Sequence, residues 1–512
     1  MVWEPKSLIL AVDAGGTGLR ALLFDRQGEA VFQEFEPLPA AHPEEGATEF
    51  DPLELWSVLK TLLVRLLKNS GVDSGAVAAL GITNQRSSFC FWDRETGEPL
   101  SKIISWQDVR AADVVDRMNR SPAWGVLRKA AGLVGFLTRG TMMTATSMLE
   151  FNTDHTITKV RWLLDRDPLL AEKCLSGRAL FGTLDSWMLY KLTGGKEHLT
   201  DLTNASSTAM FNPFDLIWNP VFCRLFDIPM GIFPGVKDSG DNFGVLDPSL
   251  LGTAIPVSAM AGDQQASLFG HTCFHPGDVK ISMGSGAFVN MNVGPRGRLS
   301  RRGLFPLIAW RVKGDLQYML EGQLAALGTM INWSINRMGW FRDPEEINSL
   351  AASCEDSGGM VLVPTPTGIR FPYFRPRMKA VVTGMGLDMG RAHLARALLE
   401  GFAHRLTDIL EGIEEDTGVR VKSIKVDGGV SRSDELLQSL ADLSGCRVER
   451  SSEVEVTARG AAYLAGLAVG FWKDTAQLAG LRGNVKTFEP ARDSRWREKN
   501  RKNWKIQVKK LL

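Results

Sequence analysis

The residues best suited to bind a polyphosphate lie in three short glycine turns that are far apart in the chain. The turns are Asp13-Ala-Gly-Gly-Thr17, Met283-Gly-Ser-Gly-Ala287 and Asp427-Gly-Gly-Val-Ser431, and each follows an apolar run with strand character. Because glycine lacks a side chain, backbone amides in such turns can face inward and approach an anion closely. One such turn is common, but three in one chain, two of them led by aspartate, predict a polyphosphate bound from several sides.

Two aspartates could supply the remaining chemistry of phosphoryl transfer, which needs aligned phosphates, a divalent metal and a carboxylate that takes the acceptor's proton. Asp13 ends its strand just before the first glycine turn, where it could meet a metal–phosphate complex; the alternative is a turn or capping aspartate. Asp263 stands between a glycine and two glutamines, after the apolar run Ile255–Ala261, which suits a general base. The alternative is an N-cap for a helix that begins at Gln264. The glycine turn that follows at Gly284 favours the catalytic interpretation.

The third turn precedes a predicted helix over Ser433–Ser444. A helix N-terminus next to Gly428 and Gly429 suits the phosphate or ribose edge of a nucleotide. A strand-to-helix turn that binds no ligand is the alternative for this position.

Two polar clusters could recognise a polyol. They are Gly81-Ile-Thr-Asn-Gln-Arg-Ser87 and Ile104-Ser-Trp-Gln-Asp-Val-Arg110, and both stand at predicted strand ends. Guanidinium and amide groups offer donors and acceptors for hydroxyls, and an indole offers a flat apolar wall. Each residue alone is as typical of a surface or a core, but the two clusters together indicate a polyol pocket.

The chain's length and composition limit its class. With 512 residues it is too long for one ordinary core, so two large domains are expected. The formal net charge of +1 argues against a nucleic-acid partner, which usually requires a basic excess. Six scattered cysteines without a CxxC pair suit a reducing cytoplasm, without a disulfide framework or zinc site. The N-terminus does not resemble a signal peptide, and no apolar run is long enough for an integral membrane segment.

Both halves of the chain alternate strand and helix patterns, which predicts two related α/β domains around a cleft. The expected strands are Leu8–Asp13, Arg20–Asp25, Ala30–Phe35, Val77–Thr83, Phe89–Asp93, Val279–Met283, Ala287–Val293, Val421–Val426 and Arg447–Arg450. The expected helices are Pro52–Ser70, Gly390–Asp416, Ser433–Ser444 and Ala458–Trp472. Small residues in the last helix permit close packing.

The C-terminal segment Arg495–Leu512 is rich in lysine and arginine, with Trp496, Trp504 and Val508 interleaved. This pattern is typical of a helix that binds an anionic surface, or of an amphipathic terminal helix with a solvated basic face. The near-neutral charge of the whole chain favours the second interpretation.

With these motifs in place, the sequence resembles the FGGY family of carbohydrate kinases, and within it the glycerol kinases, from about Leu8 to Trp472. The resemblance rests on many motifs in the family's order. They include Gly81-Ile-Thr-Asn-Gln-Arg86, Trp106-Gln-Asp108, Gly182-Thr-Leu-Asp-Ser-Trp187, Thr203-Asn-Ala-Ser206, Ala261-Gly-Asp-Gln-Gln265, Arg391-Ala-His-Leu-Ala-Arg396 and Asp427-Gly-Gly429. So many ordered matches are highly specific for the family.

The resemblance implies an α/β fold of two ribonuclease H-like domains, of the actin/hexokinase/Hsp70 type, that flank a catalytic cleft and use ATP and Mg²⁺. The expected domains are residues 1–258, with the phosphate and acceptor sites, and 259–512, with the general base, the nucleotide site and the helical tail. By this likeness Asp263 is the general base, and Asp13, with Asp263, is a metal ligand. Dimers or tetramers are usual among relatives, so a cytoplasmic homo-oligomer is expected.

The resemblance also assigns the binding residues. The nucleotide positions are Gly15, Gly16, Thr17, Arg20, Gly284, Ser285, Gly286, Gly328, Asn332, Gly428, Gly429 and Ser433. The acceptor positions are Arg86, Ser87, Trp106, Asp263, Gln264 and Phe288.

Several departures from the family pattern fall in the acceptor pocket. Glycerol kinases usually carry Arg-Glu where this chain has Arg86-Ser87, and that glutamate accepts hydrogen bonds from glycerol. Losing it could cost roughly 1.5–3 kcal/mol. Gly16 replaces a common threonine, Ser433 replaces a common asparagine, and the segment Leu127–Asn152 is longer than usual. Similar features occur in a diverged glycerol kinase paralogue of animals.

The leading hypothesis is therefore ATP-dependent phosphorylation of a primary hydroxyl of glycerol or a related small polyol. The alternatives are a kinase for a different sugar or polyol, because of Ser87, and a nucleotide-binding regulatory protein that has lost catalysis. Retention of both Asp13 and Asp263 favours an enzyme.

Overall fold

The computed structural model describes residues 3–138, 141–300, 303–375, 377–451, 455–481 and 483–512. The chain forms two compact units, each built from separate stretches of sequence. Unit 1 comprises Met1–Thr272, Leu307–Gln317 and Glu455–Arg482, and unit 2 comprises Cys273–Pro306, Tyr318–Val454 and Gly483–Leu512. The stretch from residue 259 to 272, which contains Asp263, therefore lies in unit 1; the domain boundary between residues 258 and 259 stays a prediction.

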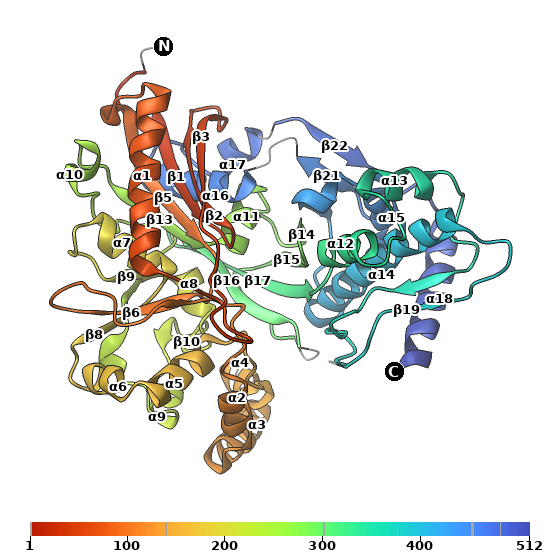
Figure 1. Cartoon of the computed structure of the whole chain (residues 1–512), viewed down its shortest axis with the longest axis horizontal. Helices are drawn as coiled ribbons and strands as arrows, with labels where there is room; N and C mark the ends of the chain where they lie inside the picture. Colours follow the sequence, from red (N-terminus) through yellow and green to blue (C-terminus); the bar gives the residue numbers. More distant parts are fainter. Residues whose placement is uncertain (1–2, 139–140, 301–302, 376, 452–454, 482) are drawn as a thin grey trace. The chain divides into compact units, whose positions relative to one another are not determined.

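The main sheet of unit 1 has five strands in the order β13-β5-β1-β2-β3 (Figure 1). Their bounds are β1 Leu8–Ala14, β2 Gly18–Phe24, β3 Ala30–Pro37, β5 Val77–Asn84 and β13 Val257–Gly262. Strand β5 runs parallel to both β1 and β13, whereas β1, β2 and β3 are antiparallel neighbours. Three parallel strands therefore end at the same edge of this sheet.

Helix α1 (Pro52–Ser70) covers the sheet with a row of buried leucines. Asp51 caps it by accepting hydrogen bonds from the backbone N–H groups of Leu53 and Glu54, and Gly71 ends it with a left-handed φ of 65°. The helix predicted at Pro52–Ser70 is thus confirmed with its bounds.

Helices α11 (Asp263–Gly270) and α16 (Val456–Ala468) pack closely on each other because small residues face one another. A Cβ on Gly460 would lie 1.8 Å from the carbonyl oxygen of Ala266, and one on Gly270 would lie 2.1 Å from that of Val456. The close packing expected from these small residues is confirmed. The helix ends at Ala468 rather than Trp472, because the chain turns at Gly470 with a φ of 74°.

Unit 1 also contains a four-stranded sheet in the order β4-β7-β6-β8. Its strands are β4 Glu49–Phe50, β7 Ile103–Ile104, β6 Phe89–Asp93 and β8 Ala179–Thr183. Around it lie helices α2 Ala112–Arg120, α3 Pro122–Thr138, α4 Thr141–Met148, α5 Thr156–Arg166, α6 Pro168–Leu175, α7 Leu184–Leu192 and α8 Leu202–Ser206. In Figure 1, α2, α3 and α4 project from the lower end of this unit.

The sheet of unit 2 contains β17, β15, β14, β20, β21 and β22 as successive neighbours. Their bounds are β14 Asp278–Met283, β15 Ala287–Gly294, β17 Asp315–Leu324, β20 Ser423–Asp427, β21 Val448–Ser451 and β22 Val485–Phe488. Helices α12 (Gly328–Asn336), α13 (Pro344–Ala352), α14 (Arg391–Thr417) and α15 (Asp434–Ser444) belong to the same unit. The strand–helix–strand order predicted for β20, α15 and β21 is confirmed.

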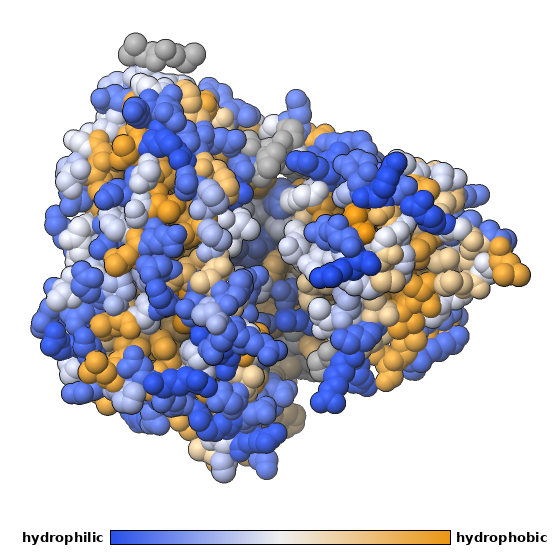
Figure 2. Space-filling model, in the orientation of Figure 1, coloured by the Kyte–Doolittle hydropathy of each residue, from blue (hydrophilic) through white to orange (hydrophobic). Residues whose placement is uncertain are grey.

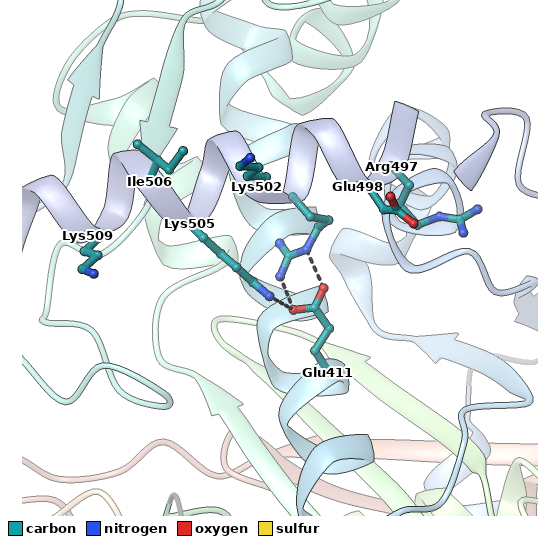
Figure 3. Close-up of a pocket in the computed structure, with 8 residues that line it drawn as sticks. Glu411, Arg497, Glu498, Lys502, Lys505, Ile506 and Lys509 are labelled. Carbon is teal, nitrogen blue, oxygen red and sulfur yellow. Dashed lines mark hydrogen bonds and ion pairs between the residues drawn. The ribbon is translucent and has the colours of Figure 1, made fainter. Parts of the chain in front are cut away.

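The C-terminal segment forms helix α18 (Ser494–Leu511), which buries Arg501, Trp504 and Val508. Arg501 donates to both carboxylate oxygens of Glu411 at 2.8 and 2.9 Å, and the same groove is lined by several lysines (Figure 3). The helix is therefore amphipathic, with one face fixed on α14 and a basic face along a groove.

No helix among the described residues is both long and apolar enough to cross a membrane. On the face drawn in Figure 2, hydrophilic and hydrophobic residues are interspersed over both units.

Candidate active site

The parallel strands of unit 1 bring three sequence motifs to one edge of the sheet. Asp13 on β1 pairs with Thr83 on β5, which in turn pairs with Ala261 on β13. The residues that follow, from Asn84 to Arg86 and from Gly262 to Asp263, therefore emerge beside Asp13. The carboxyl ends of parallel strands are where α/β proteins commonly bind ligands.

Asp13 is a buried carboxylate in a charged neighbourhood. Its Oδ2 lies 4.0 Å from Nη1 of Arg20, whose Nε lies 3.4 Å from Glu455. The pKa of Asp13 is raised to about 7, chiefly by burial; the charge of Arg20 lowers this pKa, and the charges of Asp263 and Glu455 raise it. The strand register puts Asp13 and Asp263 at one edge of the sheet, where two like charges repel each other.

Asp263 is the first residue of α11, and the capping position belongs to Gly262. The capping interpretation of Asp263 is therefore wrong. Its Oδ1 accepts a hydrogen bond from the N–H of Gln264 at 2.8 Å and lies 3.4 Å from Nε of Arg86. A Cβ on Gly262 would lie 2.5 Å from Cγ of Arg86, so this glycine lets the arginine pass close to the strand end. The guanidinium of Arg86 therefore holds the Asp263 carboxylate in orientation, and the carboxylate remains partly exposed.

A buried network supports the backbone next to Asp263. The hydroxyl oxygen Oγ1 of Thr203 accepts a hydrogen bond from the N–H of Gly262 at 2.8 Å, and its hydrogen is donated to Asp201 at 2.9 Å. Asp201 also accepts hydrogen bonds from Asn204 and from Ser239, and Asn204 exchanges hydrogen bonds with Asn84 on β5. The network therefore ties the ends of β5 and β13 together.

Two buried polar atoms at the same edge have no hydrogen-bond partner among the described residues. They are Oγ1 of Thr83 and Oε1 of Gln85. Because buried polar groups are nearly always satisfied in folded proteins, these atoms suit contact with a ligand or with ordered water.

The acceptor positions Arg86, Ser87 and Trp106 lie in unit 1. Ser87 has a left-handed φ of 63°, and its hydroxyl donates to the carbonyl oxygen of Ser207 at 2.9 Å. The backbone N–H of Trp106 donates to the hydroxyl of Ser88 at 3.1 Å. Gln264 follows Asp263 on α11, whereas Phe288 lies on β15 in unit 2.

Lys159, on α5, holds the backbone at Trp106. Its Nζ donates to the carbonyl oxygens of Ser105 at 2.9 Å and Trp106 at 2.6 Å. Burial lowers the pKa of Lys159 to about 8. No role for Lys159, Asp201 or Thr203 was predicted from the sequence, although Thr203 opens one of the motifs that carry the family resemblance.

The glycine-rich positions of unit 2 converge in a similar way. Backbone N–H groups at the start of α12 donate to the β14–β15 turn, from Leu327 to Ser285 at 2.8 Å and from Gly328 to Gly284 at 3.1 Å. A Cβ on Gly328 would lie 2.7 Å from the carbonyl oxygen of Gly284. The structure thus joins Gly284–Gly286 to Gly328.

The third turn lies beside the same β14 strand. Asp427 pairs with Ser282, and Gly428 has a φ of 87° at a position where a Cβ would lie 2.4 Å from the carbonyl oxygen of Met283. Only glycine fits this approach, so the two turns meet at the ends of adjacent parallel strands. Asn332 is exposed on α12.

Ser433 has a structural role in addition to its predicted one. Its side chain caps α15 by accepting a hydrogen bond from the N–H of Leu436 at 3.2 Å, and it donates to Asn348 on α13 at 2.5 Å. In unit 1, Gly15, Gly16 and Thr17 form the β1–β2 turn, closed by a hydrogen bond from the N–H of Gly15 to Gly18 at 3.0 Å.

Comparisons with known proteins cover nearly the whole chain. Residues 8–270 match the model of the N-terminal domain of the FGGY family of carbohydrate kinases, and residues 279–469 match that of its C-terminal domain. A glycerol kinase of Symbiobacterium thermophilum is 38% identical over 506 residues, which covers 99% of this chain and 98% of that protein. Glycerol kinase 5 of Danio rerio is 36% identical over 494 residues, covering 96% and 93% of the two chains.

Solved structures agree with these matches. The crystal structure of Plasmodium falciparum glycerol kinase with ADP superposes with a TM-score of 0.90 at 29% identity, covering 99% of this chain and 98% of that one. A xylulose kinase from Lactobacillus acidophilus, at 20% identity and a TM-score of 0.82, shares the fold. The resemblance stated from the sequence is confirmed, including that to an animal glycerol kinase paralogue.

Proposed function

Because the chain belongs to the FGGY family of carbohydrate kinases, we propose that it transfers the γ-phosphoryl group of ATP to a primary hydroxyl of glycerol or of a related small polyol. The observation that carries this proposal is the register across β5, which brings Asp13 and Asp263 to the same edge of one sheet. A kinase needs one carboxylate for the metal–phosphate complex and one for the acceptor.

In this proposal Asp263 accepts the proton of the acceptor hydroxyl as that oxygen attacks the γ-phosphorus. The Nε of its neighbour Arg86 lies 3.4 Å from Oδ1 of Asp263 and orients the carboxylate. Partial exposure keeps Asp263 accessible to a substrate hydroxyl. Because Gly262 occupies the N-cap position of α11, the side chain of Asp263 does not serve as the helix cap. Arg20, whose Nη1 lies 4.0 Å from Oδ2 of Asp13, is proposed to contact the transferring phosphate.

Magnesium would be held by Asp13, with Asp263 beside it. The residues fit a hard divalent cation, because two carboxylates offer oxygen ligands while the remaining positions can be filled by phosphate oxygens and water. When bound, the ion would neutralise charge on the phosphates. Among the described residues no group of three or more acidic, histidine or cysteine side chains could hold a metal alone, which suits an ion that arrives with its nucleotide.

The nucleotide is proposed to bind the glycine turns of unit 2. The turns at Gly284–Gly286 and Gly428–Gly429, with Gly328, leave backbone exposed at the ends of β14 and β20. Absence of side chains there allows close approach of phosphates or ribose. Asn332 and Ser433 are proposed to lie on the nucleotide side of the same site.

The acceptor is proposed to bind near Arg86, Ser87, Trp106 and Gln264 in unit 1; the role of Phe288, in unit 2, stays a prediction. Glycerol is the default substrate by likeness to the relatives, and Ser87 offers a hydroxyl where a carboxylate is usual. A hydroxyl that already donates to Ser207 can still accept one hydrogen bond from substrate. A hydroxyl is a weaker hydrogen-bond acceptor than a carboxylate. Ser87 therefore favours a substrate that depends less than glycerol does on a hydrogen bond at this position.

A screen of acceptors tests the proposal. ADP formation is measured with ATP and magnesium, with glycerol, other small polyols and pentuloses offered in turn, and with no acceptor as the control. The proposal predicts ADP formation that depends on at least one of these acceptors. ATP binding without any acceptor-dependent ADP would contradict it and would favour a nucleotide-binding protein without transfer activity.

A further inference from the structure

We propose that the helical hairpin α3–α4 docks the protein onto an anionic phospholipid surface. The outward face of α3 carries large apolar side chains at helical spacing, on Val126, Leu133 and Leu137, with Phe136 beside them. Their exposed fractions are 68%, 63%, 69% and 83%. A helix of a water-soluble domain normally turns such a stripe toward the core.

The inner face of α3 shows why the stripe is left outside. The helix meets α4 through small residues, with Ala131 and Gly135 buried and a Cβ on Gly135 predicted to lie 2.8 Å from Oγ1 of Thr144. Trp124 anchors the base of the hairpin by packing on Phe151 and Phe222. The hairpin is therefore packed through Trp124 and its small residues, while Val126, Leu133, Phe136 and Leu137 remain exposed.

The position of the hairpin allows such a contact. In Figure 1, α3 and α4 project from the lower end of unit 1, away from its five-stranded sheet. The segment is the one that the sequence singled out as longer than usual. It contributes none of the residues proposed for the phosphate, metal or acceptor sites, so a surface could be engaged without covering them.

The charge of the hairpin favours an anionic membrane over a second copy of the chain as the partner of its apolar face. From Ser121 to Leu149 the sequence contains no aspartate or glutamate, and its charged residues are Arg128, Lys129 and Arg139. Lys129 is exposed. A second copy of the chain pairing through this face would place basic groups against basic groups, because this segment itself offers no carboxylate to meet them.

A bilayer with anionic headgroups suits both the exposed apolar side chains and the basic residues of the hairpin. Exposed apolar side chains can enter the boundary between headgroups and acyl chains, and basic side chains attract the anionic headgroups.

The test uses the full chain and sedimentation with vesicles of phosphatidylcholine alone or mixed with phosphatidylserine. We expect the wild-type protein to bind the mixed vesicles. The double variant Leu133→Gln/Phe136→Gln should bind them at least about tenfold more weakly. The matched control is Leu169→Gln/Leu175→Gln, which alters two leucines of α6 that are 64% and 78% exposed and should leave vesicle binding unchanged. ATP turnover checks that each variant is folded.

Lys129→Glu provides a second variant that leaves the apolar face intact. It should weaken binding to the anionic vesicles and leave any binding to pure phosphatidylcholine unchanged. The proposal is overturned if the wild-type protein binds neither vesicle, or if the α6 control loses binding to the same extent. It is also overturned if Leu133→Gln/Phe136→Gln converts an oligomer to a monomer in sedimentation velocity, because the face would then be an interface between copies.

Discussion

Replacing Thr203 with valine tests how the active site positions Asp263. Valine has nearly the shape of threonine but lacks the hydroxyl that accepts the N–H of Gly262 at 2.8 Å and donates to Asp201 at 2.9 Å. Both contacts are buried. The substitution therefore leaves the N–H next to Asp263 without its acceptor and removes one donor from Asp201.

The expected magnitude follows from these two contacts. Leaving a buried N–H unsatisfied costs about 1–3 kcal/mol, and losing a hydrogen bond to a carboxylate costs about 1.5–3 kcal/mol. Relaxation of the strand end to satisfy the N–H would also shift Asp263, and a displacement of about 1 Å can lower turnover about a hundredfold.

Ser239→Ala is the matched control. Ser239 donates to the other oxygen of Asp201 at 2.8 Å but does not contact Gly262. Thermal unfolding should show Thr203→Val to be less stable than Ser239→Ala by about 1–3 kcal/mol. Steady-state ADP formation should show kcat lowered about ten- to a hundredfold by Thr203→Val and little changed by Ser239→Ala. Equal kcat values for the two variants would refute the positioning role.

Three further substitutions probe the pocket and the core. Lys159→Met removes the hydrogen bond to the Trp106 carbonyl, so the KM for the acceptor should rise about tenfold with the KM for ATP unchanged; equal changes in both would contradict this. Ser87→Glu should lower the KM for glycerol about ten- to a hundredfold, and an unchanged value would exclude a contact there. Burial, aided by Asp201, raises the pKa of Asp185 to about 7. Denaturant unfolding should therefore show the wild type losing stability relative to Asp185→Asn as pH rises from about 4 to about 7, by up to about 1.4 kcal/mol per pH unit. Above about pH 7 the difference in unfolding free energy should stay constant. Parallel curves of stability against pH for the two proteins would contradict this.

Much of the fold and the convergence of the site were predictable from local patterns. The apolar runs before Asp13 and Asp427 predicted buried strands, and Asp51-Pro52 before a row of leucines predicted α1 with its bounds. These signals are short-range, because caps, strand periodicity and glycine turns depend on neighbouring residues. The end of the last predicted helix was missed because Gly470 interrupts an apolar pattern that continues to Trp472.

The supporting residues could not be placed in the same way. Thr203 contacts Gly262 across 59 positions of the sequence, and Lys159 contacts Ser105 across 54. Such contacts depend on how separate elements pack, which no local pattern records. The grouping of residues 259–272 with unit 1 also arises from packing, since α11 lies against α16 from much later in the chain.

The proposed role of Asp263, as the base of an ATP-dependent phosphoryl transfer, can be tested with one substitution. The most direct measurement compares acceptor-dependent ADP formation by the wild type and Asp263→Asn, with nucleotide affinity measured calorimetrically on both. We expect Asp263→Asn to lower kcat about a hundredfold or more, because proton removal from the acceptor is lost, while nucleotide affinity stays near that of the wild type. An unchanged kcat for Asp263→Asn would contradict it.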